Sequence, residues 1–171
     1  MHKIYIGIDN GVTGTIAWVS NLHPAGFVET PVKSEQNYTR EKKNVTRIDT
    51  KALEALLQEL LEKTDTAPDE CVAVIERPMV NPMRFMASCS ALRALEATLI
   101  VLENLGIPRM YTDSRAWQKS LLPQGCKGAP ELKRASEDIG LRLFPCLDKT
   151  IKKHKDADAL LIAEWARRSN L

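Results

Sequence analysis

Three acidic residues, far apart in the chain, have the residue type and the surroundings of metal ligands. Asp9 follows the apolar run 4–8, Glu76 follows the apolar run 71–75, and Asp158 falls on the packed face of the last predicted helix. A carboxylate beside an apolar element is costly unless a partner compensates its charge. Carboxylates without a cysteine or histidine cluster suit a hard cation such as Mg²⁺ or Mn²⁺. Such a site can hold two ions about 3.5–4 Å apart, which activate water and stabilise the leaving oxygen in phosphodiester hydrolysis.

Two more candidates lie just before Asp158. Asp156 points about 200° away from Asp158 on a helical wheel, so it is the weaker candidate ligand and the better candidate for a first-turn or capping acid. His154 shares the face of Asp158 if the helix extends that far, where it would be an added ligand, a proton carrier or a neighbour of a ligand. Ordinary structure or a phosphate contact explains His154 equally well. The same wheel places Glu164 on the solvent face.

The elements that must position these residues follow from the apolar patterns. Runs 4–8 and 15–19 flank a glycine-bounded turn and predict a hairpin, and a short third strand follows it. The run 71–75 predicts a buried central strand. Helices are predicted from Asp49-Thr50 up to Pro68, over 81–105, from Ser114, over 130–143 and over 154–168, with a fifth strand over 107–111. We therefore expect an α/β protein, a single domain over residues 1–171, whose mixed sheet has helices on both faces.

Net charge, cysteine spacing and the distribution of apolar residues restrict the type of protein that this chain can be. The net charge of +2 over 171 residues is too small to indicate nucleic acid by itself, so any basic surface must be local. The four cysteines are far apart and form no CxxC pair, which favours reduced thiols over a zinc site or disulfides. The N-terminus lacks the pattern of a signal peptide, and no apolar run approaches the roughly 20 residues of a membrane span. We expect a cytoplasmic protein, in a bacterium or a phage-infected host, without membrane contact.

Three blocks of sequence together resemble the RuvC-like Holliday junction resolvases of the ribonuclease H-like superfamily, especially the short forms encoded by phages. The blocks are Ile6-Gly7-Ile8-Asp9-Asn10-Gly11, Val74-Ile75-Glu76-Arg77-Pro78 and Asp156-Ala157-Asp158-Ala159-Leu160-Leu161-Ile162-Ala163. The segment Arg115-Ala116-Trp117-Gln118-Lys119 is also similar to that family's segment after the fifth strand. The order and intervals of the blocks are more specific than any one of them.

The resemblance implies a five-stranded mixed sheet whose acids converge at one edge, a homodimer, and Mg²⁺-dependent paired nicking of branched DNA, above all of four-way junctions. Asp9 would bridge two ions, while Glu76 and Asp158 would each hold one. Family members often carry an acid or histidine one helical turn before the last aspartate. Here that neighbourhood reads His154-Lys155-Asp156, so the fourth ligand is open between His154 and Asp156.

Local groups of basic residues are candidates for phosphate contacts. The predicted long loop from about Lys33 to Arg47 contributes four of them, and the others lie in the second half of the chain: Arg40, Lys42, Lys43, Arg47, Lys119, Lys127, Lys153 and Lys155.

Three other functions share parts of this pattern. A ribonuclease or RNA–DNA hybrid nuclease would use the same metal chemistry. An actin-like or sugar-kinase phosphotransferase also opens with a strand, an aspartate and a Gly/Thr turn, but it needs a second glycine-rich phosphate loop, and this chain has only 8 glycines. A junction-binding protein without catalysis would have no use for the three acids.

Overall fold

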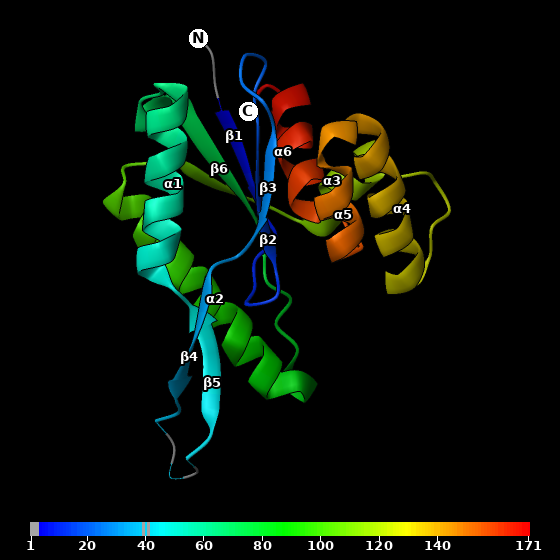
Figure 1. Ribbon diagram of the computed structural model, residues 1–171. Coiled ribbons are helices and arrows are strands. Elements are labelled where there is room, and N and C mark those ends of the chain that lie inside the picture. The colour runs from blue at the N-terminus through cyan, green and yellow to red at the C-terminus, as the bar shows by residue number, and fades with distance from the viewer. Residues whose placement is uncertain (1–3, 39, 41) are drawn as a thin grey trace.

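Figure 1 shows a central sheet with helices on both faces and a two-stranded ribbon that projects from one end of the molecule. The structure is a computed structural model, and it describes residues 4–38, 40 and 42–171. Helices α1 (Thr50–Thr64) and α2 (Phe85–Asn104) cover one face of the sheet. Helix α6 (Asp158–Arg168) covers the other, with α3 (Ser114–Leu121), α4 (Gly128–Leu143) and α5 (Asp148–His154) packed around it.

The sheet has five strands in the order β3-β2-β1-β6-β7, namely β3 (Gly26–Glu29), β2 (Thr15–Val19), β1 (Ile4–Ile8), β6 (Cys71–Glu76) and β7 (Arg109–Thr112). The first three strands pair antiparallel, whereas β1, β6 and β7 run parallel. This confirms the five-stranded mixed sheet with flanking helices. The alternation of side chains along β1 divides the core, because Ile4, Ile6 and Ile8 face α1 and α2 while Tyr5 faces the α6 side.

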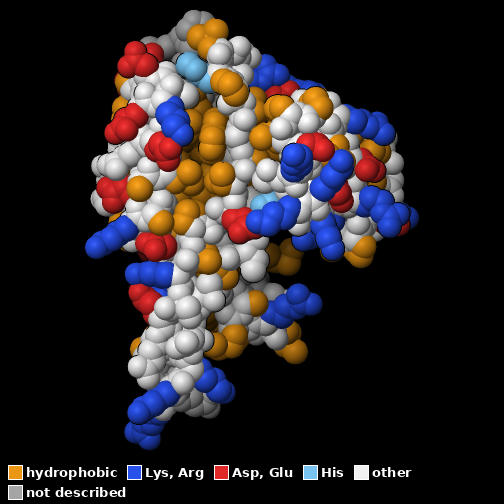
Figure 2. Space-filling model, viewed as in Figure 1, with side chains coloured by type: hydrophobic (Ala, Val, Ile, Leu, Met, Phe, Trp, Pro, Cys, Tyr) orange, Lys and Arg blue, Asp and Glu red, His pale blue; other side chains and the backbone are white. Residues whose placement is uncertain are grey.

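The segment predicted as a long basic loop is instead a β-ribbon. Strands β4 (Val32–Gln36) and β5 (Asn44–Ile48) pair antiparallel, with Lys33 opposite Arg47. Most of its side chains are exposed, so the segment has no apolar alternation that reveals a strand. The cross-strand hydrogen bonds and the contact with α2 hold it in place. Figure 2 shows basic side chains gathered at its far end.

The prediction of the last helix, over 154–168, is wrong at its N-terminal end, because two separate helices meet there. Helix α5 ends at His154, Lys155 adopts a left-handed conformation (φ 61°), and α6 begins only at Asp158. A left-handed residue ends a helix by turning the chain away from its axis. His154 and Asp158 therefore do not share a helical face.

Helix α2 is long and apolar, and much of it is exposed. Within the described residues, the segment Pro82–Asn104 is long and apolar enough to cross a membrane by length and composition alone, with a mean hydropathy of 1.6 in its most apolar window. The expectation that no apolar run approaches this length is therefore wrong. That expectation considered only uninterrupted apolar runs, and Arg93 and Glu96 interrupt this one. Only 28% of that window is buried. One such helix is weak evidence for a membrane span.

Candidate active site

The strand register brings the first two acids to one edge of the sheet. In the parallel pair β1–β6, Ile8 lies opposite Ile75, so Asp9 and Glu76 come next on neighbouring strands. Neighbouring strands are separated by about 4.8 Å. The same row continues through Thr15 of β2 to Glu29 of β3. We call this row, with the residues of α6 above it, the acid edge.

The third acid reaches the acid edge because α6 packs unusually close to β1. A side chain at Gly7 would collide with the backbone oxygen of Ala159, so only glycine permits this approach. Asp158 directly precedes Ala159 and is the first residue of α6. Side chains alternate along β1 and β6, which directs both Asp9 and Glu76 to the sheet face that α6 covers. The three acids thus lie in the same region, at one helix terminus and two strand ends, where their charges interact.

The electrostatics of the acid edge show that the three charges are close and poorly compensated. Burial raises the pKa of Asp9 from 3.8 to about 7, and the charges of Asp158 and Glu76 raise it in the same direction. Burial is also the main cause of the raised pKa values of Glu76 and Asp158. Raised carboxyl pKa values mean that burial and the neighbouring negative charges outweigh whatever stabilises the ionised forms.

Two neutral side chains hold the flanking carboxylates, and each uses one oxygen. The buried Trp117 donates its indole N–H to Glu76 Oε2 at 2.7 Å. Ser136 of α4 donates to Asp158 Oδ1 at 2.5 Å and accepts the backbone N–H of Ala157 at 3.0 Å. Within the described residues, no hydrogen bond or ion pair involves the Asp9 carboxylate or the second oxygens of Glu76 and Asp158. These oxygens are available to a cation.

Among residues 4–38, 40 and 42–171, no three acidic, histidine or cysteine side chains are gathered tightly enough to form a ready-made metal cage. The donor set nevertheless fits a hard divalent cation, because it offers carboxylate oxygens only. Orphaned polar atoms support this fit: Asp156 Oδ1 is buried without a hydrogen-bond partner, and so is the Oγ1 of Thr15, beside Asp9 in the row. Buried polar atoms without a partner are rare in folded proteins.

Asp156 belongs to the same electrostatic cluster, although it is not the helix cap that the wheel suggested. The N-cap of α6 is Ala157, without a side-chain hydrogen bond. Asp156 is 9% exposed and lies 3.5 Å from the ammonium of Lys133 on α4. Its charge contributes to the raised pKa values of both Asp9 and Asp158, whereas Lys133 lowers them.

His154 lies on the flank of the acid edge. Its ring packs edge-on against Phe27 at a centroid distance of 5.2 Å, and its Nε2 is 3.6 Å from a carboxylate oxygen of Glu29. Glu29 is two strands from Asp9 in the row, which corresponds to roughly 10 Å. The break between α5 and α6 therefore places His154 beside another acid, away from Asp158.

Sequence reasoning missed Lys133, Ser136 and the indole of Trp117. Lys133 is one of many basic residues in the second half of the chain, and nothing in its spacing distinguishes it. Trp117 lies within the segment similar to the resolvases, but its position six residues after the predicted strand shows only that it can be buried. Each of these side chains acts across a tertiary contact that no local pattern encodes.

The predicted phosphate-binding residues form two groups. Arg40, Lys42 and Lys43 lie in the turn of the ribbon, and Arg47 lies in β5 at 2.9 Å from Glu35. The others are distributed over the helical side: Lys119 is on α3, Lys127 precedes α4, Lys153 pairs with Glu29 at 2.9 Å, and Lys155 terminates α5.

Known proteins resemble this chain in structure and not in sequence. No family model matches it, and no curated protein matches its sequence. The structure of T. thermophilus RuvC in complex with a Holliday junction substrate matches with a TM-score of 0.60 and 18% identity, over 97% of this chain and 96% of that chain. A second T. thermophilus RuvC structure matches with a TM-score of 0.54 and 18% identity, over 98% and 96%. The chain thus has the ribonuclease H-like fold of RuvC, as its sequence blocks predicted.

Proposed function

We propose that this protein is an endonuclease that depends on a divalent metal and cuts branched DNA, with the four-way junction as its substrate. The observation that carries the proposal is the acid edge, where Asp9, Glu76 and Asp158 lie close together with raised pKa values and, within the described residues, form no ion pair. The likeness to a RuvC structure that holds a Holliday junction supports the choice of substrate. Glu164, the buried acid further along α6, is ion-paired with two arginines, so the unpaired acids of this cluster call for a functional explanation.

Asp9, Glu76 and Asp158 would hold Mg²⁺ or Mn²⁺, two ions in all, with Asp156 as the fourth carboxylate. Bound there, such cations lower the pKa of water and neutralise charge on the phosphodiester. Trp117 and Ser136 would keep the Glu76 and Asp158 carboxylates oriented, in the way that outer hydrogen bonds orient metal ligands. Lys133 would offer its ammonium to a phosphate oxygen at the edge, and the products would carry 5′-phosphate and 3′-hydroxyl ends.

The DNA arms would lie over the acid edge and the ribbon. Arg40, Lys42 and Lys43 would contact the backbone from the ribbon turn, while Lys119, Lys127, Lys153 and Lys155 would contact it from the helical side. Such contacts make affinity depend steeply on salt. A protein acting on recombining DNA in this way would work in the bacterial or phage-infected cytoplasm, as one domain over residues 1–171.

A homodimer follows from the need for two incisions. Met83, just before α2, and Phe85 and Met86, in its first turn, are 91%, 69% and 68% exposed, an apolar surface larger than isolated side chains explain. Pairing α2 with its copy would cover this surface and present two acid edges to opposed strands. Sedimentation equilibrium tests the dimer: the wild type should sediment as a dimer and Met86→Arg as a folded monomer.

The deciding experiment incubates the protein with labelled four-way junction, linear duplex and RNA–DNA hybrid, with Mg²⁺ or with EDTA. We expect symmetrical nicks in the junction alone, only with Mg²⁺, and none from Asp9→Asn. Junction binding in EDTA should survive that substitution, because it removes a metal ligand and no phosphate contact. If the protein cleaves the RNA–DNA hybrid in preference to the junction, the same site belongs to a ribonuclease. If Asp9→Asn retains full activity, the acid edge is not the catalytic site.

A further inference from the structure

The root of the ribbon carries a second group of like charges, opposite in sign to the acid edge. A cavity of about 70 Å³ lies between the ribbon and α2. Three cations line it: Lys33 from β4, Arg47 from β5 and Arg93 from α2. Three hydroxyl side chains share the lining, those of Thr46, Thr50 and Ser90. This volume exceeds what one water molecule needs several times over.

The positive charge of this cavity is only partly compensated. Lys33 and Arg47 share a single carboxylate, that of Glu35, at 2.6 and 2.9 Å. Arg93 forms no ion pair within the described part of the chain. Asp49, the next carboxylate along β5, accepts the backbone N–H of Ala52 as the N-cap of α1. Two of the three cations thus share one acid, and the third has no ion pair within the described residues.

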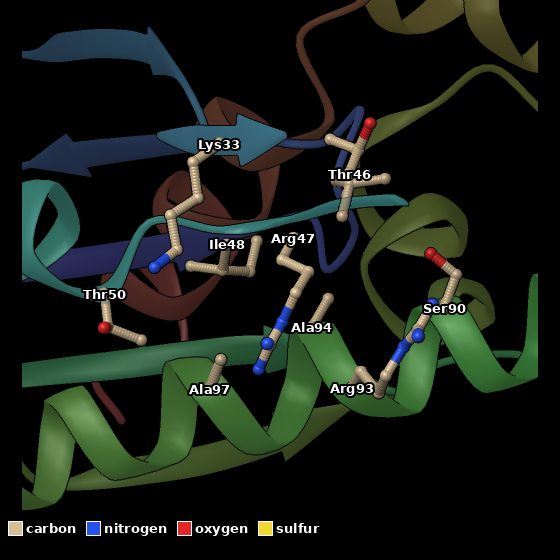
Figure 3. A pocket seen from close by; sticks show the side chains of 10 residues that line it. Lys33, Thr46, Arg47, Ile48, Thr50, Ser90, Arg93, Ala94 and Ala97 are labelled. Atoms are coloured by element: carbon tan, nitrogen blue, oxygen red, sulfur yellow. The ribbon is translucent and has the colours of Figure 1, made fainter. Parts of the chain in front are cut away.

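The side chains approach the cavity from both of its walls (Figure 3). Arg47 extends from the ribbon toward α2 above Ala94 and Ala97, and Arg93 rises from α2 on the side of Ser90. Guanidinium groups, an ammonium and hydroxyls together are the donor set that recognises phosphate oxygens.

The cavity adjoins the loop that carries the first acid. Val12, three residues after Asp9, is part of its lining. Asn10 donates its side-chain amide to the backbone oxygen of Ala91, one residue after Ser90 and two before Arg93. A phosphate held at the ribbon root would therefore be tied through α2 and this loop to the acid edge.

We propose that this cavity is a phosphate-binding site, separate from the acid edge, that takes a backbone phosphate of a DNA arm lying along the ribbon. The inference rests on the proposed function for its partner, and it adds Lys33, Arg93 and the three hydroxyls to the binding surface. The ribbon turn with its basic residues would guide the arm, and the root would fix its register relative to Asp9.

The test measures junction binding by fluorescence anisotropy in EDTA, where no cleavage occurs, at a series of KCl concentrations. Arg93→Gln should lower the slope of log Kd against log salt by about one, the loss expected for one phosphate contact. Arg93→Lys should keep most of the slope. Arg109→Gln is the matched control, because Arg109 begins β7 at the opposite edge of the sheet and lies near Glu103.

Glu35→Gln gives a prediction of opposite sign. It frees Lys33 and Arg47 from their shared carboxylate, so junction binding should tighten and the salt slope should increase. A loss of folding cannot produce tighter binding. Wild-type slopes for both Arg93→Gln and Glu35→Gln, in a protein that binds and cuts junctions normally, would overturn this inference alone.

Two further outcomes distinguish free phosphate from DNA phosphate as the ligand, and distinguish failure of this inference from failure of the proposed function. Inorganic phosphate titrated by calorimetry would reveal a site for a free phosphate: Arg93-dependent binding of phosphate beside Arg93-independent binding of junctions would overturn the DNA assignment. A wild type that binds no DNA in EDTA and cuts none in Mg²⁺ would overturn the proposed function, and this inference with it.

Discussion

Two acids on the same helix, Asp158 and Glu164, have opposite surroundings. Glu164 is 4% exposed and accepts hydrogen bonds from both Arg167 and Arg168 at 2.7–2.8 Å. Despite its burial, these arginines lower its pKa. Asp158 accepts from the neutral Ser136 and lies among other carboxylates, and its pKa is raised. Glu164 has positive partners three and four residues away in the sequence, whereas Asp158 forms no ion pair within the described residues.

The largest difference between these two acids should be catalytic. We expect Asp158→Asn to reduce junction cleavage by about 10³-fold or more, because it removes a proposed metal ligand from the acid edge. Glu164→Gln should cleave at close to the wild-type rate. Single-turnover cleavage of a labelled junction in Mg²⁺ measures both. Equal losses of cleavage in the two variants would mean that both substitutions act by disturbing the folding of α6, and that Asp158 has no catalytic role.

The second difference concerns stability and pH without metal. The pKa of Asp9 is raised from 3.8 to about 7, so the folded state binds the proton more tightly than the unfolded state, and stability falls as pH rises from about 4 to 7. In EDTA at pH 8, Asp9→Asn should therefore unfold with a free energy up to about 4 kcal/mol higher than the wild type, and near pH 4 the two should converge.

Urea denaturation at pH 4, 6 and 8 gives these free energies. The two acids should respond to pH with opposite signs, because the lowered pKa of Glu164 gives stability that is present above pH 4.5 and lost as pH falls. Mg²⁺ should stabilise the wild type at pH 8 and leave Asp9→Asn unchanged. An Asp9→Asn protein less stable than the wild type at pH 8 would contradict this account of the acid edge.

A smaller effect is expected from the neutral groups that hold the acids. Trp117→Phe keeps most of the buried aromatic volume and removes the donor to Glu76 Oε2, so we expect cleavage to fall about 10- to 100-fold. If Trp117 orients a ligand, the Mg²⁺ concentration for half-maximal rate should rise as well. A lower melting temperature with an unchanged Mg²⁺ dependence would show that the indole only supports packing.

The smallest expected effect is that of Glu164→Gln on stability. Its arginine partners are 31% and 48% exposed, so solvent screens their attraction for the carboxylate. We expect a loss of about 1–2 kcal/mol in the free energy of unfolding at pH 7, measured by urea denaturation. Arg168→Gln, which removes one of the two donors, should lose less.

The sequence predicted the central sheet and the three acids, and it misplaced Glu164. Strands β1 and β6 are short apolar runs that each lead to an acid, and such runs form buried strands in almost any context. The wheel assigned Glu164 to solvent because Glu164 shares a face with Arg167 and Arg168, and a charged face is normally exposed. Helix α6 is instead buried almost all round, between the sheet and helices α3 and α4, and the two arginines make a buried glutamate tolerable.

The sequence alone was thus enough to predict the strands, the positions of Asp9 and Glu76 at strand ends, and the inward direction of Asp158. Each of these predictions follows from an apolar pattern with a period of 2 or 3.6 residues. The partners of those acids required the assembled fold. Trp117 and Ser136 reach Glu76 and Asp158 across 41 and 22 residues of sequence, and Lys33 meets Arg93 only because the ribbon lies on α2. Such contacts depend on how the sheet and helix layers pack. Packing between segments that are distant in sequence produces no periodic pattern of residues from which it could be predicted.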